Sequence, residues 1–498
     1  MNRRATDVLD ELRRRRATDA PTHGGRILSY VYDSGRDEID RLAAAAADAV
    51  RPVNGLDPTV FGSVAAMERD LIAFTRSAFG DANRPAGGSA AVGTVTSGGT
   101  ESCLLAVLSA RRTAGLPVGR GNIVMPATAH AAFTKAGELL GLQVRRVPVD
   151  PTSTRVDPAR LADHIDAETV LVVASAPNYP TGAIDPIVSI GALAAQRGVP
   201  LHVDACLGGF ALAWWPDELP HWDLRVPGVA SLSADFHKYG YAPKGASVVL
   251  FTDRDRHRAA YFATADWPGY PVVNPTLLGS RSATGTAAAW AITEYLGADG
   301  FTELVRPVAT ARDALVEAVA DIDGLRVVGR PEGPVFAVAA DTASSTPIDP
   351  HRWSREVRTR GFTLQEQPRY VQDDETELPA STHLTVTPAT GKVVDELRAA
   401  MTEAADAARG QPPVQAPEAL GDLGAAFASG TVTVDDALSL DSAATEAVLV
   451  GAGIDPRTDP STASDAIDIG AVIAAIDLLP KPVTAAMLIE FLAAYTTP

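Results

Sequence analysis

One lysine lies where a chain can present a reactive amine. Lys238 belongs to the stretch SADFHKYGYAPKG (residues 233–245), between the apolar runs VASLS and ASVVLF, so we expect it in a loop at a strand end. A lysine there, beside a histidine and small residues, suits a nucleophile that forms a Schiff base, because such lysines act when neutral and are tuned by their surroundings. An isolated lysine between two strands is more commonly an exposed hairpin residue, so the assignment depends on other motifs.

A glycine-rich turn provides a second kind of chemistry. The stretch TSGGTES (residues 96–102) precedes the helical run CLLAVL. Consecutive glycines before a helix N-terminus expose backbone N–H groups, and Thr100 adds a hydroxyl beside Gly99, which together make a cradle for a phosphate group. By itself this signal is weak, because Gly-Gly before a helix is often only a turn.

Two further polar residues follow apolar strands. In HVDACLGGF (residues 202–210), Asp204 ends a strand, and a buried carboxylate there needs a partner such as a pyridinium N–H, unless it is a helix N-cap. In ATAHAAFTKA (residues 127–136), His130 begins a helix and can stack on a ring, although a lone histidine there is more often a cap or packing residue. The order of cradle, aromatic residue, aspartate and lysine at strand ends is far more specific than any one member.

The elements that must position these residues alternate along the chain. From about Val53 to Leu296, apolar runs such as NIVM, TVLVVAS, PLHVDA and ASVVLF are separated by segments with helical spacing. Strands that are apolar on both faces are typical of a parallel sheet covered by helices on both sides. The pattern predicts a doubly wound α/β domain over residues 53–300, with ligands at the carboxyl ends of its strands.

The rest of the chain divides into three shorter parts. Residues 1–52 form an N-terminal segment, and residues 301–410 change to a long helix, two or three strands and a closing helix, which predicts a smaller α+β domain. After the linker-like stretch QPPVQAPE, residues 418–498 form an acidic extension with two apolar helical stripes. We expect these stripes to pack on a subunit near a dimer interface; a disordered acidic extension is the alternative.

Bulk properties exclude several classes of protein. A net charge of −18 over 498 residues disfavours a nucleic-acid binder, because the phosphate backbone would be repelled. Two cysteines, Cys103 and Cys206, are too few for a disulfide framework or a structural zinc site, and we expect no metal. The charged N-terminus lacks the apolar stretch of a secretory signal, and no apolar window is long enough for a membrane span. We therefore expect a cytoplasmic protein.

Together the motifs resemble the group II decarboxylase superfamily, whose members depend on pyridoxal 5'-phosphate (PLP), and within it they are most similar to the sphingosine-1-phosphate lyases. The resemblance spans roughly residues 30–290 and is carried by TSGGTES, TAHAAFTKA, SAPNYPTGAIDPI, LHVDACLGGF, DFHKYGYAPKGASVV and GSR. It implies PLP fold type I, in which a large domain with a mainly parallel sheet precedes a smaller α+β domain; here a helical tail is appended. It also implies a homodimer with shared active sites.

The resemblance assigns the cofactor-binding residues. It implies that Lys238 forms the Schiff base with PLP, that Asp204 keeps the pyridine nitrogen protonated so that the ring accepts electrons, and that His130 stacks on the ring. The residues that it assigns to the cofactor phosphate are Gly99, Thr100, His237 and, from a second subunit, Ser280.

Four residues are assigned to the substrate. Tyr32, Asn54 and Lys244 match lyase positions near the substrate's phosphate end, whereas Asp57 stands where the lyases have a phosphate-contacting histidine. A carboxylate a few Å from a phosphate dianion is repulsive by several kcal/mol in a partly buried site. If Asp57 faces the pocket, phosphorylated amino alcohols should bind poorly; if it turns away or caps a helix before Phe61, the phosphate site survives.

The expected activity is cleavage of a carbon–carbon bond at the Cα of a small amine or amino-acid substrate. Loss of CO₂ would make the protein an amino-acid decarboxylase, and cleavage of Cα–Cβ beside a β-hydroxyl would make it a retro-aldol lyase. The candidates for proton transfer are Lys238, Tyr239 and His237. A non-catalytic interaction protein that acts through the acidic tail is the remaining alternative, and the joint presence of Lys238, Asp204, His130 and Thr100 disfavours it.

Overall fold

A seven-stranded sheet forms the centre of the large domain in the computed structural model, which describes residues 3–84, 90–455, 457 and 469–497. The strand order is β1-β7-β6-β5-β4-β2-β3. Strand β7 is antiparallel to both of its neighbours, and the remaining pairs are parallel, which confirms the predicted mainly parallel α/β sheet. The strands are β1 (Val92–Thr96), β2 (Asn122–Pro126), β3 (Gln143–Val147), β4 (Thr169–Ser175), β5 (Leu201–Asp204), β6 (Val229–Ala234) and β7 (Ser247–Phe251).

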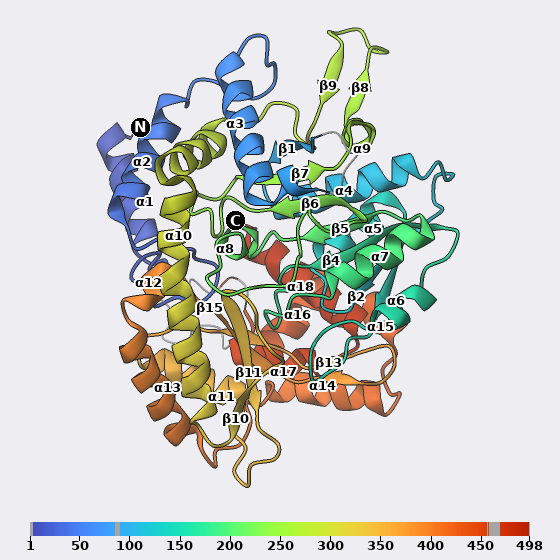
Figure 1. The fold of residues 1–498 in the computed structure, drawn as a ribbon. Coiled ribbons are helices and arrows are strands. Elements are labelled where there is room, and N and C mark those ends of the chain that lie inside the picture. The colour runs from blue at the N-terminus through green and yellow to red at the C-terminus, as the bar shows by residue number, and fades with distance from the viewer. Residues whose placement is uncertain (1–2, 85–89, 456, 458–468, 498) are drawn as a thin grey trace.

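Helices cover this sheet, which explains why its central strands are buried on both faces (Figure 1). Strands β2, β4, β5, β6 and β7 are buried at every position. Only their ends are open to a ligand, so the polar residues that follow the strands define the site. The helices between the strands are α4 (Gly99–Thr113), α5 (Ala132–Leu140), α6 (Pro158–Asp163), α7 (Ile187–Arg197), α8 (Gly209–Leu212) and α9 (Arg254–Ala259).

Two N-terminal helices, α2 (Asp37–Ala49) and α3 (Gly62–Ala78), pack on a long helix that extends from the large domain to the small domain (Figure 1). This helix, α10 (Thr284–Ala320), is interrupted at Gly297, where φ is 52°. The domain boundary predicted at residue 300 therefore falls inside a helical element, just after its break. The other elements of this part are α1 (Ala5–Arg16), the 3-10 turn η1 (Asp81–Asn83), and a projecting hairpin of β8 (Phe262–Thr264) and β9 (Val272–Asn274).

The small domain is built on a four-stranded antiparallel sheet in the order β10-β11-β15-β12. Helices α11 and α13 pack against each other and against α10 or the sheet, which joins the two domains. The elements are β10 (Leu325–Val327), β11 (Val335–Ala340), α11 (Pro350–Thr359), β12 (Gln365–Gln367), β13 (Tyr370–Val371), β14 (Glu377–Leu378), β15 (Ser381–Thr385), α12 (Pro388–Gly391) and α13 (Val394–Ala408).

The described residues of the C-terminal extension form helices, and α17 (Ile469–Ile476) and α18 (Lys481–Tyr495) contact the small domain. Nζ of Lys481 donates to the carbonyl of Val371 at 3.2 Å and lies 4.2 Å from the ring centre of Tyr370. The outer apolar face of the extension is exposed to solvent, with Leu488 and Leu492 exposed by 48% and 61%. None of the helices that the structure describes is both long and apolar enough to cross a membrane. The other helices of the extension are α14 (Glu418–Ala428), α15 (Val434–Leu438) and α16 (Ser442–Gly451).

Candidate active site

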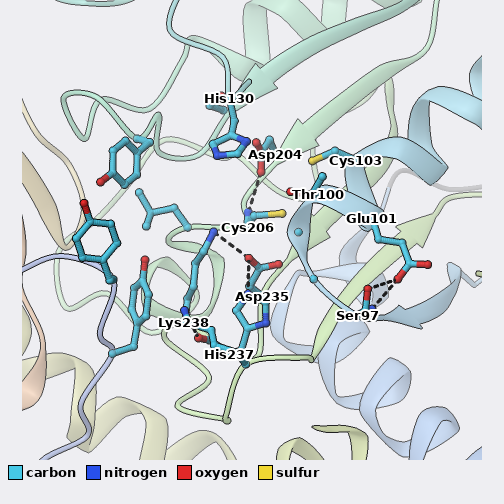
Figure 2. Close-up of a pocket in the computed structure, with 18 of the residues that line it drawn as sticks. Ser97, Thr100, Glu101, Cys103, His130, Asp204, Cys206, Asp235, His237 and Lys238 are labelled. Atoms are coloured by element: carbon cyan, nitrogen blue, oxygen red, sulfur yellow. Dashed lines mark hydrogen bonds and ion pairs between the residues drawn. The ribbon is translucent and has the colours of Figure 1, made fainter. Parts of the chain in front are cut away.

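The carboxyl ends of the central strands open into a cavity of about 550 Å³ (Figure 2). Asp204 ends β5, Lys238 lies in the loop after β6, and His130 lies in the loop after β2, so three strands bring these side chains to one cavity. The predicted residues that line it are Tyr32, Gly99, Thr100, His130, Asp204, His237, Lys238 and Lys244.

A buried carboxylate holds Lys238 as an ammonium ion. Nζ of Lys238 lies 2.8 Å from Oδ2 of Asp235, and Nε2 of His237 lies 3.3 Å from the same oxygen (Figure 2). Burial alone would lower the pKa of Lys238, but the Asp235 carboxylate outweighs burial and raises that pKa well above its usual range. Burial alone would raise the pKa of Asp235, yet the charges and hydrogen bonds of Lys238 and His237 hold it below its usual range. A proton must therefore leave this pair before the Lys238 amine can react.

The N-terminus of α4 forms another wall of the cavity. Gly98, Gly99 and Thr100 line it there. A Cβ on Gly99 would lie 2.7 Å from Oδ2 of Asp235, so this position requires glycine for the close approach of helix and loop. The first N–H groups of a helix lack partners within it, and together with the Thr100 hydroxyl they make a site for an anion.

Glu101 fixes the conformation of this turn. Its Oε2 accepts hydrogen bonds from the backbone N–H and the hydroxyl of Ser97, both at 2.7 Å. Its Oε1 accepts from the backbone N–H of Leu277, also at 2.7 Å, which links the turn to the segment before Ser280. The carboxylate is therefore occupied by donors of its own chain and acts as a positioning group for the cradle.

Asp204 and His130 both point into the cavity (Figure 2). Oδ1 of Asp204 accepts the backbone N–H of Cys206 at 3.0 Å, and the side chain is buried. Nδ1 of His130 accepts the backbone N–H of Ala132 at 3.2 Å, so the histidine caps the first turn of α5 while its ring borders the cavity. The capping contact fixes the ring plane, which suits a residue that stacks on a flat ligand.

Two thiols lie beside Asp204. Ligand atoms of Cys103, Asp204 and Cys206 lie within 4.8 Å of one another, the one group of this kind with metal-ligand spacing in the part of the chain that the structure describes. Sγ of Cys206 donates to Oγ of Ser233 at 3.1 Å, and burial raises the pKa of Cys206 well above its usual range. Metals bind the thiolate form of cysteine, so an environment that keeps the thiol protonated disfavours a metal. The two thiols instead pack as neutral groups beside Asp204.

Two tyrosines and a second lysine complete the wall. Burial raises the pKa of Tyr32 to about 12, although the nearby charge of Lys238 opposes the shift. Nζ of Lys244 lies 4.6 Å from the ring centre of Tyr32, and desolvation together with repulsion by Lys238 lowers the pKa of Lys244 to about 8. Tyr179 stacks on His383 with ring centres 4.3 Å apart, and burial raises its pKa as well. The cavity thus holds two neutral phenols and a titratable ammonium group.

The geometry separates the three candidates for proton transfer. The hydroxyl of Tyr239 donates to the carbonyl of Val386 at 2.8 Å and does not line the cavity, so this geometry disfavours Tyr239 among the candidates. Nδ1 of His237 accepts backbone N–H groups at 3.3 Å, and its Nε2 faces Asp235, so both ring nitrogens are engaged. Lys238 remains as the group with a free path into the cavity.

Three predicted residues lie outside the Lys238 cavity. Asn54 and Asp57 line a separate hollow of about 690 Å³, and Ser280 does not line the Lys238 cavity. Oδ1 of Asp57 accepts the backbone N–H of Thr59 at 2.8 Å and its hydroxyl at 2.7 Å, contacts that lower the pKa of Asp57. Asp57 therefore caps the turn before Phe61. Within this chain, Asp57 does not face the Lys238 cavity, so its carboxylate does not repel a phosphate there.

Three residues of the site carry little signal in the sequence. Asp235 precedes Lys238 by three residues, a spacing that allows an ion pair in one loop, and the DFHK stretch is the only hint of it. Tyr179 belongs to a loop, and its position depends on the small-domain residue His383 that it stacks on. Glu101 looks like an exposed helix residue in the sequence, yet it is buried.

The sequence matches the family model described as "Pyridoxal-dependent decarboxylase conserved domain" over residues 53–323. The sphingosine-1-phosphate lyase of Dictyostelium discoideum is 38% identical over 338 residues, which cover 67% of this chain and 63% of that protein. The sphingosine-1-phosphate lyase of Arabidopsis thaliana is 33% identical over 413 residues, 82% of this chain and 73% of that protein. The chain spans about 63–64% of the length of several curated relatives that it matches.

Solved structures give the same picture. The sphingosine-1-phosphate lyase of Burkholderia pseudomallei aligns with a TM-score of 0.76 and 33% identity over 86% of this chain and 94% of that one. The glutamate decarboxylase of Lactobacillus brevis aligns with a TM-score of 0.70 over 82% of this chain and 94% of that one, at 20% identity. The second likeness is informative about the fold alone.

Proposed function

This chain belongs to the pyridoxal-dependent decarboxylase family, and we propose that it is a PLP-dependent lyase that breaks the Cα–Cβ bond of a phosphorylated amino alcohol. The observation that carries the proposal is the meeting of Lys238, Asp204 and the N-terminus of α4 in one cavity. The relatives with 33–38% identity are lyases of sphingosine 1-phosphate, a substrate with an amine, a β-hydroxyl and a phosphate. That chemistry supports the lyase over the amino-acid decarboxylase.

The residues of the cavity fit PLP. A lysine amine suits the aldehyde, a buried carboxylate on Asp204 suits the pyridinium N–H, and the α4 cradle with Thr100 and His237 suits the phosphate. The close packing of Gly99 on Asp235 supports this assignment, because a Cβ would fill the space between the cradle and the lysine loop. When bound, PLP supplies a protonated ring that accepts the electron pair released at Cα.

The side chains around the cofactor divide the remaining work. Asp235 pairs with the protonated amine of Lys238. The amine becomes a nucleophile once it has lost this proton. Lys238 then accepts or returns a proton at the substrate, because its Nζ faces the cavity. Tyr32 and Tyr179 stay protonated at neutral pH and serve as hydrogen-bond donors to a substrate hydroxyl. His130 would stack on the ring and hold its plane, whereas the residues that contact the substrate's other groups would orient its Cα bonds.

Lys244 is the group that we assign to the substrate phosphate. Its ammonium stands at the cavity wall against the face of Tyr32. A phosphate near −2 gains from one positive charge at short range in a partly desolvated site. Asp57 does not oppose it within the subunit, because its carboxylate is engaged by Thr59.

We also propose that the enzyme works as a homodimer. The hairpin β8–β9 projects from the large domain and exposes aromatic side chains, with Trp267 and Tyr270 exposed by 46% and 61%. An exposed apolar surface of this kind is typical of an interface. A partner that covers it would come close to the hollow of Asn54 and Asp57, which Tyr270 also lines.

A product assay tests the proposed function. The purified protein, supplied with PLP, should convert sphingosine 1-phosphate to a long-chain aldehyde and phosphoethanolamine, and Lys238→Ala should abolish the reaction. The control is a panel of amino acids, from which no CO₂ should be released. Release of CO₂ from an amino acid without any aldehyde from the phosphorylated amine would replace the proposal with the decarboxylase.

A further inference from the structure

A second chamber of about 510 Å³ adjoins the cavity of Lys238, and we call it the annex chamber. Tyr30 and Tyr179 line both spaces, so the two meet at these side chains. Besides Tyr30 of the N-terminal segment, three parts of the chain contribute to its walls. They come from residues 127–128 of the large domain, from β12 and residues 378–381 of the small domain, and from Ile473 of α17 in the C-terminal extension.

Tyr30 stands at the junction in a strained conformation. Its φ is 61°, the left-handed region that residues other than glycine rarely adopt. Its hydroxyl donates to Oε1 of Gln365 in β12, a wall of the annex chamber. Strain of this kind persists where the surrounding structure enforces it, and it is concentrated at ligand sites. The backbone here is arranged to place an aromatic ring between the two spaces.

Thr128 presents an unpaired hydroxyl to the annex chamber. Its side chain is buried, with 3% exposed, and its Oγ1 has no hydrogen-bond partner among the residues that the structure describes. A buried hydroxyl without a partner is destabilising, so a ligand atom that bonds to it would be favoured. Thr128 lies two residues before His130, so this contact would fall near the catalytic end of a bound molecule.

Among the described residues, the lining of the annex chamber offers no positive charge to an anionic occupant. Glu366 is the charged residue of its lining, and no lysine, arginine or histidine belongs to the lining as far as the chain is described. The Glu366 carboxylate lies 3.6 Å from the guanidinium of Arg358, which neutralises it. The remaining walls are mostly proline, tyrosine and aliphatic side chains, including Val328 and Leu378. Such a chamber fits an uncharged and largely apolar group.

The extension is held tightly against this chamber. A Cβ on Gly470 would lie 3.0 Å from Oε2 of Glu366 and 3.1 Å from Nε of Arg355, so α17 approaches β12 and α11 closely. This approach holds Ile473 in the wall of the annex chamber. The extension is therefore part of the chamber's structure, even though the cofactor-binding residues lie in the large domain.

We propose that the annex chamber receives the uncharged tail of the substrate, and that α17 of the C-terminal extension sets which tails are accepted. The inference rests on the proposed function, because it places the amine end at Lys238 and the phosphate at Lys244. The tail leaves in the other direction, between Tyr30 and Tyr179, and ends against Ile473. The substrate class is then a primary amine with an apolar chain and a hydrogen-bonding group close to the amine, which reaches Thr128.

Binding of simple amines tests this inference without requiring turnover. The full-length, PLP-loaded protein is titrated with butylamine and with decylamine, and the change in cofactor absorbance gives each Kd. Ile473→Asp should weaken decylamine binding by about tenfold or more, since apolar contact is lost along the chain, and should change butylamine binding by less than about twofold. Ile489→Asp is the matched control, because Ile489 lies in the same extension but is 71% exposed and outside the chamber; it should change neither.

A second variant covers the case in which an aspartate unfolds the extension. Ile473→Trp keeps the wall apolar but fills the chamber, and it should weaken decylamine while sparing butylamine. Equal effects on both amines, or no effect on either, would overturn the role of α17. Chain-length selectivity without any cleavage of phosphorylated amino alcohols would instead retain the annex chamber and reject the proposed reaction. If phosphorylated amino alcohols are cleaved but the Ile473 variants do not distinguish long from short substrates, the proposed reaction is retained and the role of the annex chamber is rejected.

Discussion

Nζ of Lys238 lies 2.8 Å from Oδ2 of Asp235, and the aspartate is buried beneath the loop that carries both residues. The carboxylate stabilises the ammonium form of Lys238, and a nucleophilic lysine must lose the proton of that form. Gly99 packs against the same carboxylate, which leaves the aspartate little room to turn away. The pair therefore sets the pH range in which the lysine amine becomes available.

Asp235→Asn should move the reaction of Lys238 with PLP to lower pH. The carboxylate is what raises the pKa of Lys238, and burial, which remains in the variant, lowers it. The amine is consequently neutral at a lower pH than in the parent protein. The rate of PLP attachment to the apoprotein, followed by absorbance across a pH series, measures the shift. Lys238→Ala is the control that should show no attachment, and a profile identical to the parent would contradict the ion-pair assignment.

Gly99→Ala should impair cofactor binding far more than Gly98→Ala. A Cβ at Gly99 would lie 2.7 Å from the Asp235 carboxylate, whereas one at Gly98 would lie 3.3 Å from a ring carbon of His237. Overpacking of this kind destabilises by about 1–3 kcal/mol. The PLP dissociation constant of each variant and its midpoint of thermal unfolding give the comparison. Equal affinities in the two variants would show that the cradle does not depend on close packing.

Asp204→Asn should retain PLP but lose most activity. The α4 cradle still holds the phosphate, yet an amide does not keep the pyridine nitrogen protonated. Each unit by which the pKa of that nitrogen falls is worth about 1.4 kcal/mol, so two units correspond to about a hundredfold loss in kcat. Equilibrium dialysis and steady-state kinetics separate the two effects. Turnover near the parent rate would refute the role of Asp204 as the partner of the ring nitrogen.

Substrate affinity should fall as the pH rises through about 8. Lys244 has its pKa lowered to about 8 by desolvation, so its positive charge is complete well below this pH and is lost above it. KM for a phosphorylated amino alcohol should therefore rise across this range. In Lys244→Arg the charge persists, because arginine does not titrate there, and KM should stay flat. The same rise in both proteins would assign the titration to another group.

Asp57→His should leave the substrate KM within about twofold of the parent value. The Asp57 carboxylate caps the turn at Thr59 and lies outside the Lys238 cavity of its own subunit. The substitution removes the cap, so a small drop in thermal stability is expected. A marked improvement in KM for the phosphorylated substrate would show that Asp57 acts on the cavity of a partner subunit.

The sequence is most informative where function follows from neighbours along the chain. Asp204 ends a buried strand, and Lys238 and His130 each follow one, so a short-range pattern is enough to locate them at one edge of the sheet. Tyr179 is different, because its position depends on a stacking partner in another domain. Asp57 shows the limit of motif matching, since a local capping contact decides where its carboxylate points.

The boundary between the large and the small domain leaves little signal in the sequence, because it falls inside a helix. The helical period continues through residue 300, and the break in α10 comes from one backbone torsion at Gly297. Strands of two or three residues, such as β13 and β14, are too short to show a period of two. The docking of the extension depends on α17 packing against β12 and α11, a long-range contact that no local pattern contains.

The hydrogen bond of Tyr239 to the small domain bears on the order in which the chain folds. Tyr239 is the residue after Lys238, and its hydroxyl reaches the carbonyl of Val386, just beyond the last strand of the small domain. The lysine loop is therefore tied to a second folding unit, which must be in place before the loop is complete. A nascent chain that has finished only its large domain lacks this tie. The hydrogen bond that ties the lysine loop to the small domain can thus form only after residue 386 has been made.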